Sequence, residues 1–256
     1  MTDQPDADLW AACEQALRIA PLAGDLMRIV ESQEQIATLA LVDDLAEQAV
    51  LEELLEQAKP PVPAGAERLH YLLSTPFRYP PLRHGSRFGR RFEPSLFYGA
   101  RRLPTLLAEA AYYRFVFWTA MAEPPPSGRL RTQHSIFRAR FRGARGARLQ
   151  QPPCAAHAAM LRHPIDYGPT QRLGSALRGA GIDVFEYPSA RDRDAGLNVA
   201  LFHPAALVSR RPLDLSPWLC ETRAEQVTFA PEAAPDLHRF ALTDFTADGR
   251  LPLPAA

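Results

Sequence analysis

Apolar side chains recur at helical spacing through the first sixty residues of the chain. A helix is predicted from residue 9 to about residue 19, with Asp8 as its cap and Pro21 as its interruption. A second run follows Gly24 and extends over residues 26–55, ending at the prolines of residues 60–63. We therefore expect residues 1–60 to form an N-terminal helical extension. Its apolar stripe would pack on the rest of the chain, which we favour, or form a dimer surface.

After residue 65 the pattern changes to short apolar and aromatic runs that are typical of strands. Helices are predicted from Pro104 to about residue 122 and over residues 171–179. Strands are predicted at residues 69–73, 95–100, 135–141, 184–187, 198–202 and 226–229. We expect a main domain over residues 65–235, followed by a C-terminal tail over residues 236–256.

The composition is that of a globular protein and does not by itself indicate a function. The 256 residues are 46% hydrophobic and 23% charged, which is typical of a globular chain and argues against disorder. Three well-separated cysteines exclude a disulfide framework and favour a reducing, cytoplasmic compartment, and no standard zinc spacing occurs. We expect no signal peptide. Glu109 and Arg114 interrupt the most apolar run, so we expect no membrane span.

The net charge of zero conceals a division along the chain. Residues 1–59 hold thirteen acidic and three basic residues, whereas residues 60–150 hold sixteen arginines and four glutamates. The basic segment predicts an anionic partner, such as a phosphate-bearing ligand, nucleic acid or the acidic segment itself. We expect no direct binding of nucleic acid, because this surplus of arginine is its only support.

Three features carry candidate chemistry. Glu109 is the only acid in an apolar predicted helix, so it lies at a solvated edge or is buried with a partner. Arginines interleave with aromatic residues in the loop of residues 77–92, a composition that can hold a phosphate and a flat ring or can simply be a solvated basic loop. Ser189 follows Pro188 without a G-x-S-x-G elbow, which argues against a serine nucleophile.

Taken together, these segments resemble the RES domain, a family named for its Arg, Glu and Ser. The resemblance covers about residues 65–235, and its five motifs occur in the family's order. They are Phe77-Arg78-Tyr79, Gly85-Ser86-Arg87-Phe88-Gly89 with Arg91, Leu96-Phe97-Tyr98-Gly99-Ala100, Ala108-Glu109, and Tyr187-Pro188-Ser189-Ala190-Arg191 with Asn198.

The resemblance implies an α+β fold similar to that of ADP-ribosyltransferases, with a split, mostly antiparallel sheet, helices and a cleft for NAD, here preceded by the N-terminal helical segment. Members of the family are typically toxins that degrade NAD by hydrolysis or phosphorolysis and are neutralised by an Xre-type antitoxin. NAD would thus be a substrate, inorganic phosphate a candidate acceptor, and no cofactor or metal is implied.

The resemblance also implies roles for individual residues. Its catalytic positions match Arg78, Glu109 and Ser189, with Glu109 stabilising positive charge on the ribose and Ser189 positioning the ligand. Its substrate-binding positions match Tyr79, Arg91, Tyr98, Gln171, Arg191 and Asn198. Arg87 is expected to be structural or secondary. Many relatives carry a serine where this chain has Gly168, a departure that bears on activity.

Two alternatives stay open at this point. A protein ADP-ribosyltransferase would use the same cleft with a protein side chain as the acceptor. A catalytically silent interaction module would keep the RES fold and bind a partner, a hypothesis that the long acidic N-terminal segment favours.

Overall fold

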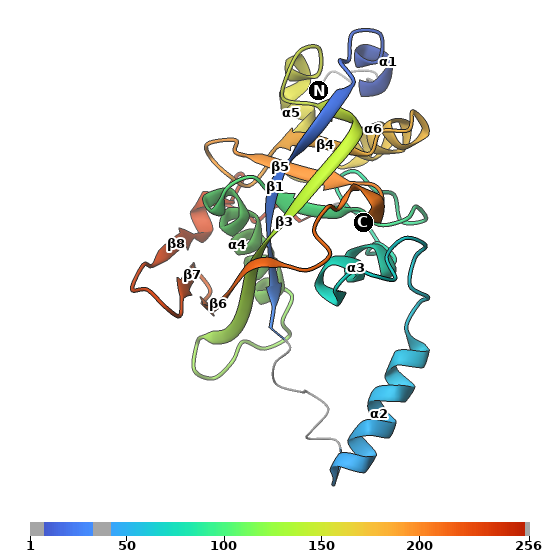
Figure 1. Cartoon of the computed structure of the whole chain (residues 1–256). Helices are drawn as coiled ribbons and strands as arrows, with labels where there is room; N and C mark the ends of the chain where they lie inside the picture. Colours follow the sequence, from blue (N-terminus) through green and yellow to red (C-terminus); the bar gives the residue numbers. More distant parts are fainter. Residues whose placement is uncertain (1–7, 33–41, 254–256) are drawn as a thin grey trace.

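A computed structural model describes residues 8–32 and 42–253 of the chain. Six of its eight longest elements follow residue 70, and one sheet contains both β1, near the N-terminal end, and β8, near the C-terminal end (Figure 1). The helices are α1 (Leu9–Cys13), α2 (Leu45–Ala58), α3 (Tyr71–Arg78), α4 (Leu103–Thr119), α5 (Ala158–Leu161) and α6 (Gly168–Gly179). The strands are β1 (Ala20–Glu31), β2 (Phe97–Ala100), β3 (Leu130–Arg148), β4 (Val184–Pro188), β5 (Leu197–Leu201), β6 (Leu213–Thr222), β7 (Gln226–Pro231) and β8 (His238–Ala241). Short 3₁₀ turns η2 (Cys154–His157), η3 (Pro204–Ala206) and η4 (Leu242–Asp244) join them.

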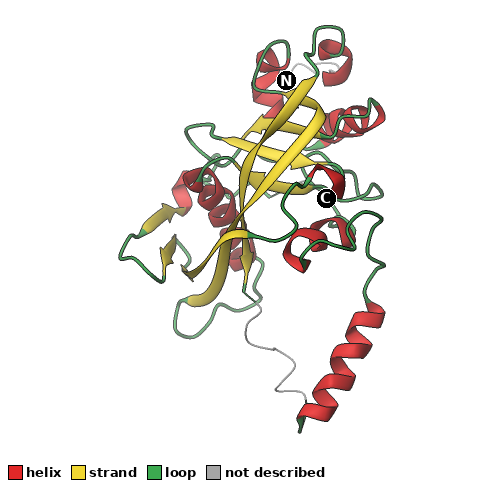
Figure 2. Cartoon of the chain, viewed as in Figure 1, coloured by secondary structure: helices red, strands yellow, loops and turns green. Residues whose placement is uncertain are grey.

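The eight strands form one sheet in the order β1-β2-β5-β4-β3-β6-β7-β8, with helices against its outside (Figure 2). Because β1 also pairs with β3, the first five strands of this order close into a ring, from which β6, β7 and β8 extend. Among the described strands every pairing is antiparallel except that of β3 with β4. The expectation of an α+β fold with a mostly antiparallel sheet is confirmed.

Strand β1 corrects the prediction of helix after Gly24. Residues 20–31 form a strand that pairs with β3 at eleven positions, from Ala20 opposite Gly146 to Glu31 opposite His134. Apolar residues such as Leu26, Ile29 and Val30 fit helical spacing, but they also fit a strand that contacts other elements on both of its faces. The helix predicted for residues 9–19 ends at Cys13, and the helical prediction for residues 33–41 lies outside the described residues.

Most of the other predicted elements are present in the structure, and one is wrong. Helices α4 and α6 and strands β2, β3, β4, β5 and β7 are where the pattern predicts them. The strand predicted at residues 69–73 is wrong, because α3 begins at Tyr71, with His70 accepting a hydrogen bond from Leu72 N as its cap. Strands β6 and β8 were not predicted.

The C-terminal segment returns to the main body. Phe245 is buried beside Phe115 of α4, and Tyr112 Oη donates a hydrogen bond of 2.6 Å to the carbonyl of Pro252. Helix α4 is therefore enclosed by this segment on one side and by the sheet on the other, where Trp218 and Phe229 belong to its apolar cluster. The divisions at residues 60 and 235 stay predictions.

Candidate active site

A cavity of about 300 Å³ opens between α4 and the ends of β1, β2, β4 and β5. Its walls combine one carboxylate, Glu109, with one amide, Asn198, and two guanidinium groups, Arg28 and Arg87. Four tyrosines complete the lining, namely Tyr98, Tyr113, Tyr167 and Tyr187. A mostly apolar cavity in which a few polar groups converge is the usual form of a small-molecule site.

The Glu109 carboxylate is held by two donors from different strands. Ser189 Oγ donates a hydrogen bond of 2.5 Å to Glu109 Oε1, and Asn198 Nδ2 donates one of 2.8 Å to the same oxygen. Oε2 makes no hydrogen bond with any described residue. One carboxylate oxygen is thus fixed by the protein, while the other is available to a ligand in the cavity.

The orientation of Ser189 follows from the loop after β4. Its hydroxyl oxygen accepts hydrogen bonds from the backbone amides of Arg191 and Asp192 at 3.1 and 3.0 Å, so its own proton is directed at Glu109. Arg162 Nε binds the Ser189 carbonyl at 2.8 Å, and Ser189 N donates to the carbonyl of Gly196 at 2.8 Å. The fully buried Ser189 therefore positions the Glu109 carboxylate, whereas the resemblance implied that it positions the ligand.

Arg28 is a cation on the inner wall that sequence reasoning missed. Its Nη1 donates a hydrogen bond of 2.6 Å to the carbonyl of Tyr98, and its guanidinium lies 5.0 Å from the centre of the Phe97 ring. Its Nε is buried and has no hydrogen-bond partner among the described residues. Burial lowers the pKa of Arg28 to about 10. An enclosed cation with an unused donor is suited to an anionic ligand.

Arg87 provides a second cation at the cavity. Its Nη1 donates hydrogen bonds to the carbonyls of His163 at 2.9 Å and Leu161 at 3.3 Å, and its guanidinium stacks 4.5 Å from the centre of the Tyr167 ring. These contacts anchor the loop of residues 85–89 to the segment before α6. Arg87 therefore lines the cavity as well as holding its wall, although only a secondary role was expected for it.

The tyrosines form an aromatic wall, in which the hydroxyl groups of Tyr98, Tyr113 and Tyr187 stay protonated at neutral pH. Burial raises the pKa of Tyr98 to about 12 and places that of Tyr187 well above its ordinary value. Tyr98 Oη pairs with Ser86 Oγ at 2.8 Å, and its ring meets that of Tyr187 edge to face at 6.3 Å. Burial likewise raises the pKa of Tyr113. These rings can flank a flat ligand but are poor acid–base groups.

Three of the residues expected at the site lie away from the cavity. Arg78 ends α3 and binds Glu56 of α2 at 2.7 Å as well as the carbonyl of Pro60. Tyr79 is 40% exposed, and Arg91 is exposed beside the Phe92 ring.

Two further expected residues support the walls from behind. Gln171 Nε2 donates hydrogen bonds to the carbonyls of His84 at 2.8 Å and Ser86 at 3.0 Å, which fixes the loop that carries Arg87. Arg191 stacks 3.5 Å from the centre of the Tyr112 ring and donates to Tyr167 Oη at 3.2 Å. Gly168 begins α6 and does not line the cavity.

The described residues contain neither a cluster of metal-binding side chains nor a membrane-spanning helix. No group of three or more His, Cys, Asp or Glu side chains is arranged to hold a metal ion. None of the described helices has both the length and the apolar character needed to span a bilayer.

The chain is similar to a known protein family and to chains in solved structures. The family model described as the RES domain matches residues 62–241. A chain in the crystal structure of the M. tuberculosis MbcT-MbcA toxin-antitoxin complex is 12% identical, with 78% of this chain and 87% of that chain covered and a TM-score of 0.46. No curated protein sequence matches the chain.

Proposed function

Because the chain belongs to the RES domain family, we propose that it degrades NAD by breaking the bond between nicotinamide and ribose. The observation that carries this proposal is the Glu109 carboxylate, fixed by Ser189 and Asn198 at the wall of an aromatic, cationic cavity. We propose NAD as a consumed substrate rather than a bound cofactor.

Cleavage of the bond between nicotinamide and ribose requires one carboxylate, whereas most glycosidases use a pair. Nicotinamide leaves as a neutral ring and needs no proton, while positive charge develops on the ribose carbon and ring oxygen. A negative group beside that charge lowers the barrier, most strongly where water is excluded. Glu109 supplies this charge, and the donors on Oε1 prevent the carboxylate from rotating away as the ribose becomes cationic.

The remaining cavity groups match the other parts of the dinucleotide. A cavity of about 300 Å³ is at the lower end of small-molecule sites, which suits the nicotinamide riboside end of NAD, with the diphosphate towards the arginines. The tyrosine wall can stack on the nicotinamide ring and hold it at one distance from Glu109. Arg28 and Arg87 supply the positive charge at the cavity wall, whereas the resemblance matched Arg78 to a catalytic position and Arg91 to a substrate-binding position.

The acceptor of ADP-ribose determines the products. With water, oxygen bonds to the ribose carbon as the bond to nicotinamide breaks, giving ADP-ribose, nicotinamide and one proton. With inorganic phosphate, a phosphate oxygen forms that bond and the product is ADP-ribose 1″-phosphate. Because burial raises the pKa of Tyr98 and Tyr187, these hydroxyl groups do not activate water at neutral pH, and a nucleophile that is already anionic, such as phosphate, is favoured.

We further propose that the protein is a cytoplasmic toxin held inactive by a partner. Family membership supports this role, because uncontrolled loss of NAD would stop growth of the cell that makes the enzyme. The partner would be an antitoxin, expected to be of the Xre type, with a segment that covers the cavity mouth near Tyr113, a ring that is 46% exposed.

The test is NAD consumption by the purified chain, with and without inorganic phosphate. Glu109→Gln keeps the shape of the side chain and one acceptor oxygen for Ser189 and Asn198, but it replaces the other oxygen by an NH₂ donor and removes the charge. We expect a fall in kcat of about 10²–10³-fold, by analogy with removal of one electrostatic group from an active site. Glu232→Gln is the matched control at an exposed carboxylate and should leave the rate unchanged.

The same assay separates the alternatives. Label from NAD that appears on protein and disappears in Glu109→Gln would replace degradation by protein ADP-ribosylation. If the wild type, freed of any partner, neither binds nor consumes NAD, the proposal is wrong and an interaction module describes the chain better.

A further inference from the structure

Two hydrogen bonds join one face of α4 to residues 189–196, the loop between β4 and β5, which we call the serine loop. Thr105 Oγ1 donates a hydrogen bond of 2.7 Å to Asp192 Oδ2, and Ser189 Oγ donates one of 2.5 Å to Glu109 Oε1. Thr105 and Glu109 are four residues apart, so their side chains lie one above the other on α4. The serine loop is therefore attached to α4 at two points about one helical turn apart.

Asp192 connects these two points, because its side chain acts at one of them and its backbone at the other. Its carboxylate accepts the proton of Thr105, while its backbone amide donates a hydrogen bond of 3.0 Å to Ser189 Oγ. Thr105 is fully buried and Asp192 is 8% exposed, so the hydrogen bond between them forms away from water, where it is costly to break. Neither residue lines the cavity, and both reach a ligand only through Ser189 and Glu109.

The turn that follows Asp192 keeps its carboxylate in one orientation. Asp192 Oδ1 accepts a hydrogen bond of 3.0 Å from the amide of Asp194, which leaves Oδ2 for Thr105. The carbonyl of Asp192 accepts from Ala195 N at 3.0 Å and from Arg162 Nη2 at 3.2 Å. Both the side chain and the backbone of Asp192 are thus fixed within the serine loop.

Gly196 leaves the space that the contact between Thr105 and Asp192 needs. A Cβ at this position would lie 2.0 Å from Thr105 Oγ1 and 2.4 Å from Asp192 Oδ2, so any larger residue would push the two groups apart. Gly196 stands two residues before Asn198, the second donor to Glu109 Oε1. The contact therefore lies between the two segments that hold the carboxylate.

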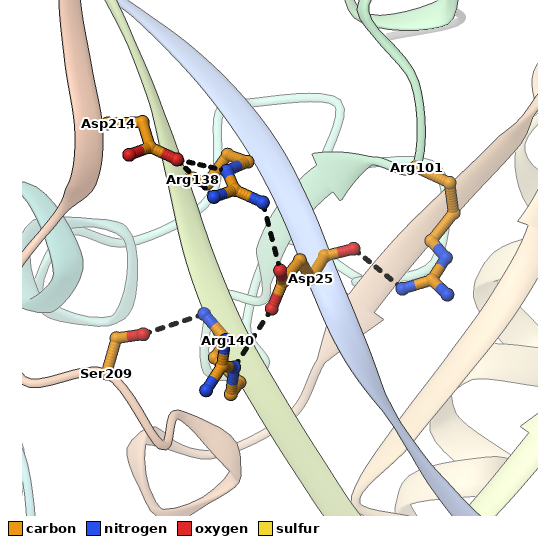
Figure 3. A network of polar contacts seen from close by, with 6 residues as sticks. All are labelled: Asp25, Arg101, Arg138, Arg140, Ser209 and Asp214. Carbon is orange, nitrogen blue, oxygen red and sulfur yellow. Dashed lines mark hydrogen bonds and ion pairs between the residues drawn. The ribbon is translucent and has the colours of Figure 1, made fainter.

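Burial distinguishes Asp192 from the acids of the polar network in Figure 3. There Asp25 binds Arg138 and Arg140 at 3.2 Å each, and all three side chains are at least partly exposed. Exposed ion pairs of this kind contribute little, because water and salt screen them. None of the three residues lines the cavity. Asp25 is therefore a suitable control, an acid with two side-chain partners that lies apart from Glu109.

We propose that Asp192 is a positioning residue, which acts through Thr105 and Ser189 to hold the Glu109 carboxylate beside the substrate. The inference rests on the proposed function for the substrate and names the part of the fold that keeps the carboxylate in place. Without the hydrogen bond to Thr105, the serine loop moves away from α4 and the Ser189 proton no longer meets Glu109 Oε1. A displaced carboxylate stabilises the transition state less, whereas binding of the substrate in its ground state changes little.

NAD turnover by Thr105→Val, which removes the hydroxyl with little change of shape, tests the proposal. We expect kcat to fall by about 10- to 100-fold with KM nearly unchanged, since a misplacement of about 1 Å costs up to about 10²-fold. Asp192→Ala should have the same effect. Thr105→Ser keeps the donor and should keep kcat within about twofold of the wild type. Equal losses in Thr105→Ser and Thr105→Val would overturn the proposal.

Two controls separate positioning from a general loss of stability. Thr222→Val makes the same change at another fully buried threonine, which accepts a hydrogen bond of 3.2 Å from Arg114 Nε of α4. It should lower the urea midpoint about as much as Thr105→Val and leave kcat unchanged. Asp25→Ala removes two of the ion pairs in Figure 3 and should also leave kcat unchanged. The proposal is wrong if kcat falls as far in Thr222→Val as in Thr105→Val.

A double-mutant cycle with Ser189→Ala tests the route of the effect. Once the Ser189 hydroxyl is absent, Thr105→Val should lower kcat by no more than about twofold further, because both changes remove one arrangement. Losses that simply multiply would show that Asp192 does not act through Ser189.

Amide hydrogen exchange of the protein without NAD tests the geometry independently of the reaction. Thr105→Val should speed exchange of the Arg191 and Asp192 amides, which bind Ser189 Oγ, by about tenfold or more, and Thr222→Val should not. Unchanged exchange of these amides would overturn the proposal even if kcat falls. If exchange responds as expected while the wild type consumes no NAD, the proposed function fails and the placement of Glu109 by Asp192 stands.

Discussion

Replacing Arg28 by methionine separates what this residue does for the fold from what it does for a ligand. Methionine has a similar length and no charge, so it fills the space beside Phe97 without a guanidinium. On the proposed function, Arg28 supplies positive charge to an anionic substrate. We expect the variant to fold with nearly unchanged stability and to lose activity, whereas changes at buried positions usually cost stability.

The magnitude follows from two opposing contributions. Burial lowers the pKa of Arg28 to about 10, which at about 1.4 kcal/mol per pH unit corresponds to a cost of roughly 3 kcal/mol for holding the cation in the folded protein. Against this, the substitution removes the charged hydrogen bond to the carbonyl of Tyr98, worth about 1.5–3 kcal/mol. The free energy of unfolding should therefore change by less than about 1.5 kcal/mol. Loss of one charged hydrogen bond to the substrate should lower kcat/KM by about 10- to 150-fold.

Urea unfolding and NAD turnover on the same samples provide the measurement. The folded pKa of Arg28 lies below its unfolded value, so the unfolded chain binds more protons above pH 10 and the wild type gains stability as pH rises there. Arg28→Met should lack this gain. Destabilisation of more than 3 kcal/mol, or turnover equal to that of the wild type, would refute the reasoning.

Three other changes test separate parts of the structure. Arg78→Ala should leave NAD turnover within about twofold and cost less than about 1 kcal/mol, because its ion pair is partly exposed, while limited proteolysis after α2 should become faster. Burial and, to a smaller extent, a neighbouring arginine lower the pKa of His134 to about 4. The unfolded chain therefore binds a proton first as the pH falls, and the free energy of unfolding of the wild type should decrease by roughly 3 kcal/mol between pH 6.5 and pH 4. Urea unfolding of His134→Gln should show a weaker dependence of this free energy on pH. Gly174→Ala would place a Cβ 1.9 Å from the carbonyl oxygen of Phe88 and should lower both the melting temperature and turnover, whereas Gly179→Ala meets nothing within 4 Å and should do neither.

The sequence could predict the site wherever a motif stands on a locally determined element. Glu109 lies on a helix that has Pro104 in its first turn and few polar residues, so the sequence could predict both the helix and the unusual position of this acid. Ser189 and Asn198 follow or belong to short strands with clear ends, and the structure brings both to one oxygen of Glu109.

Arg28 could not be placed in the same way, because its strand is defined by distant partners. Nothing local distinguishes β1 from an amphipathic helix, and its pairing with β3 spans more than a hundred residues of chain. The signal that was present is an arginine between Met27 and Ile29 in an apolar run, which would be costly on a buried strand without a function. Arg78 is the opposite case, since a residue in a matching motif lies at the end of α3, where it pairs with Glu56 instead of lining the cavity.

The position of β1 matters for anyone who dissects this chain into fragments. The family match begins at residue 62, yet β1 and its arginine lie some thirty residues before that point. An expression product cut at the boundaries of the match would lose the strand that covers β3 over eleven paired positions, leaving a long open edge prone to self-association. It would also lose the enclosed cation of the cavity, so a failure of the fragment to consume NAD would be an artefact of truncation and would say nothing about the full chain.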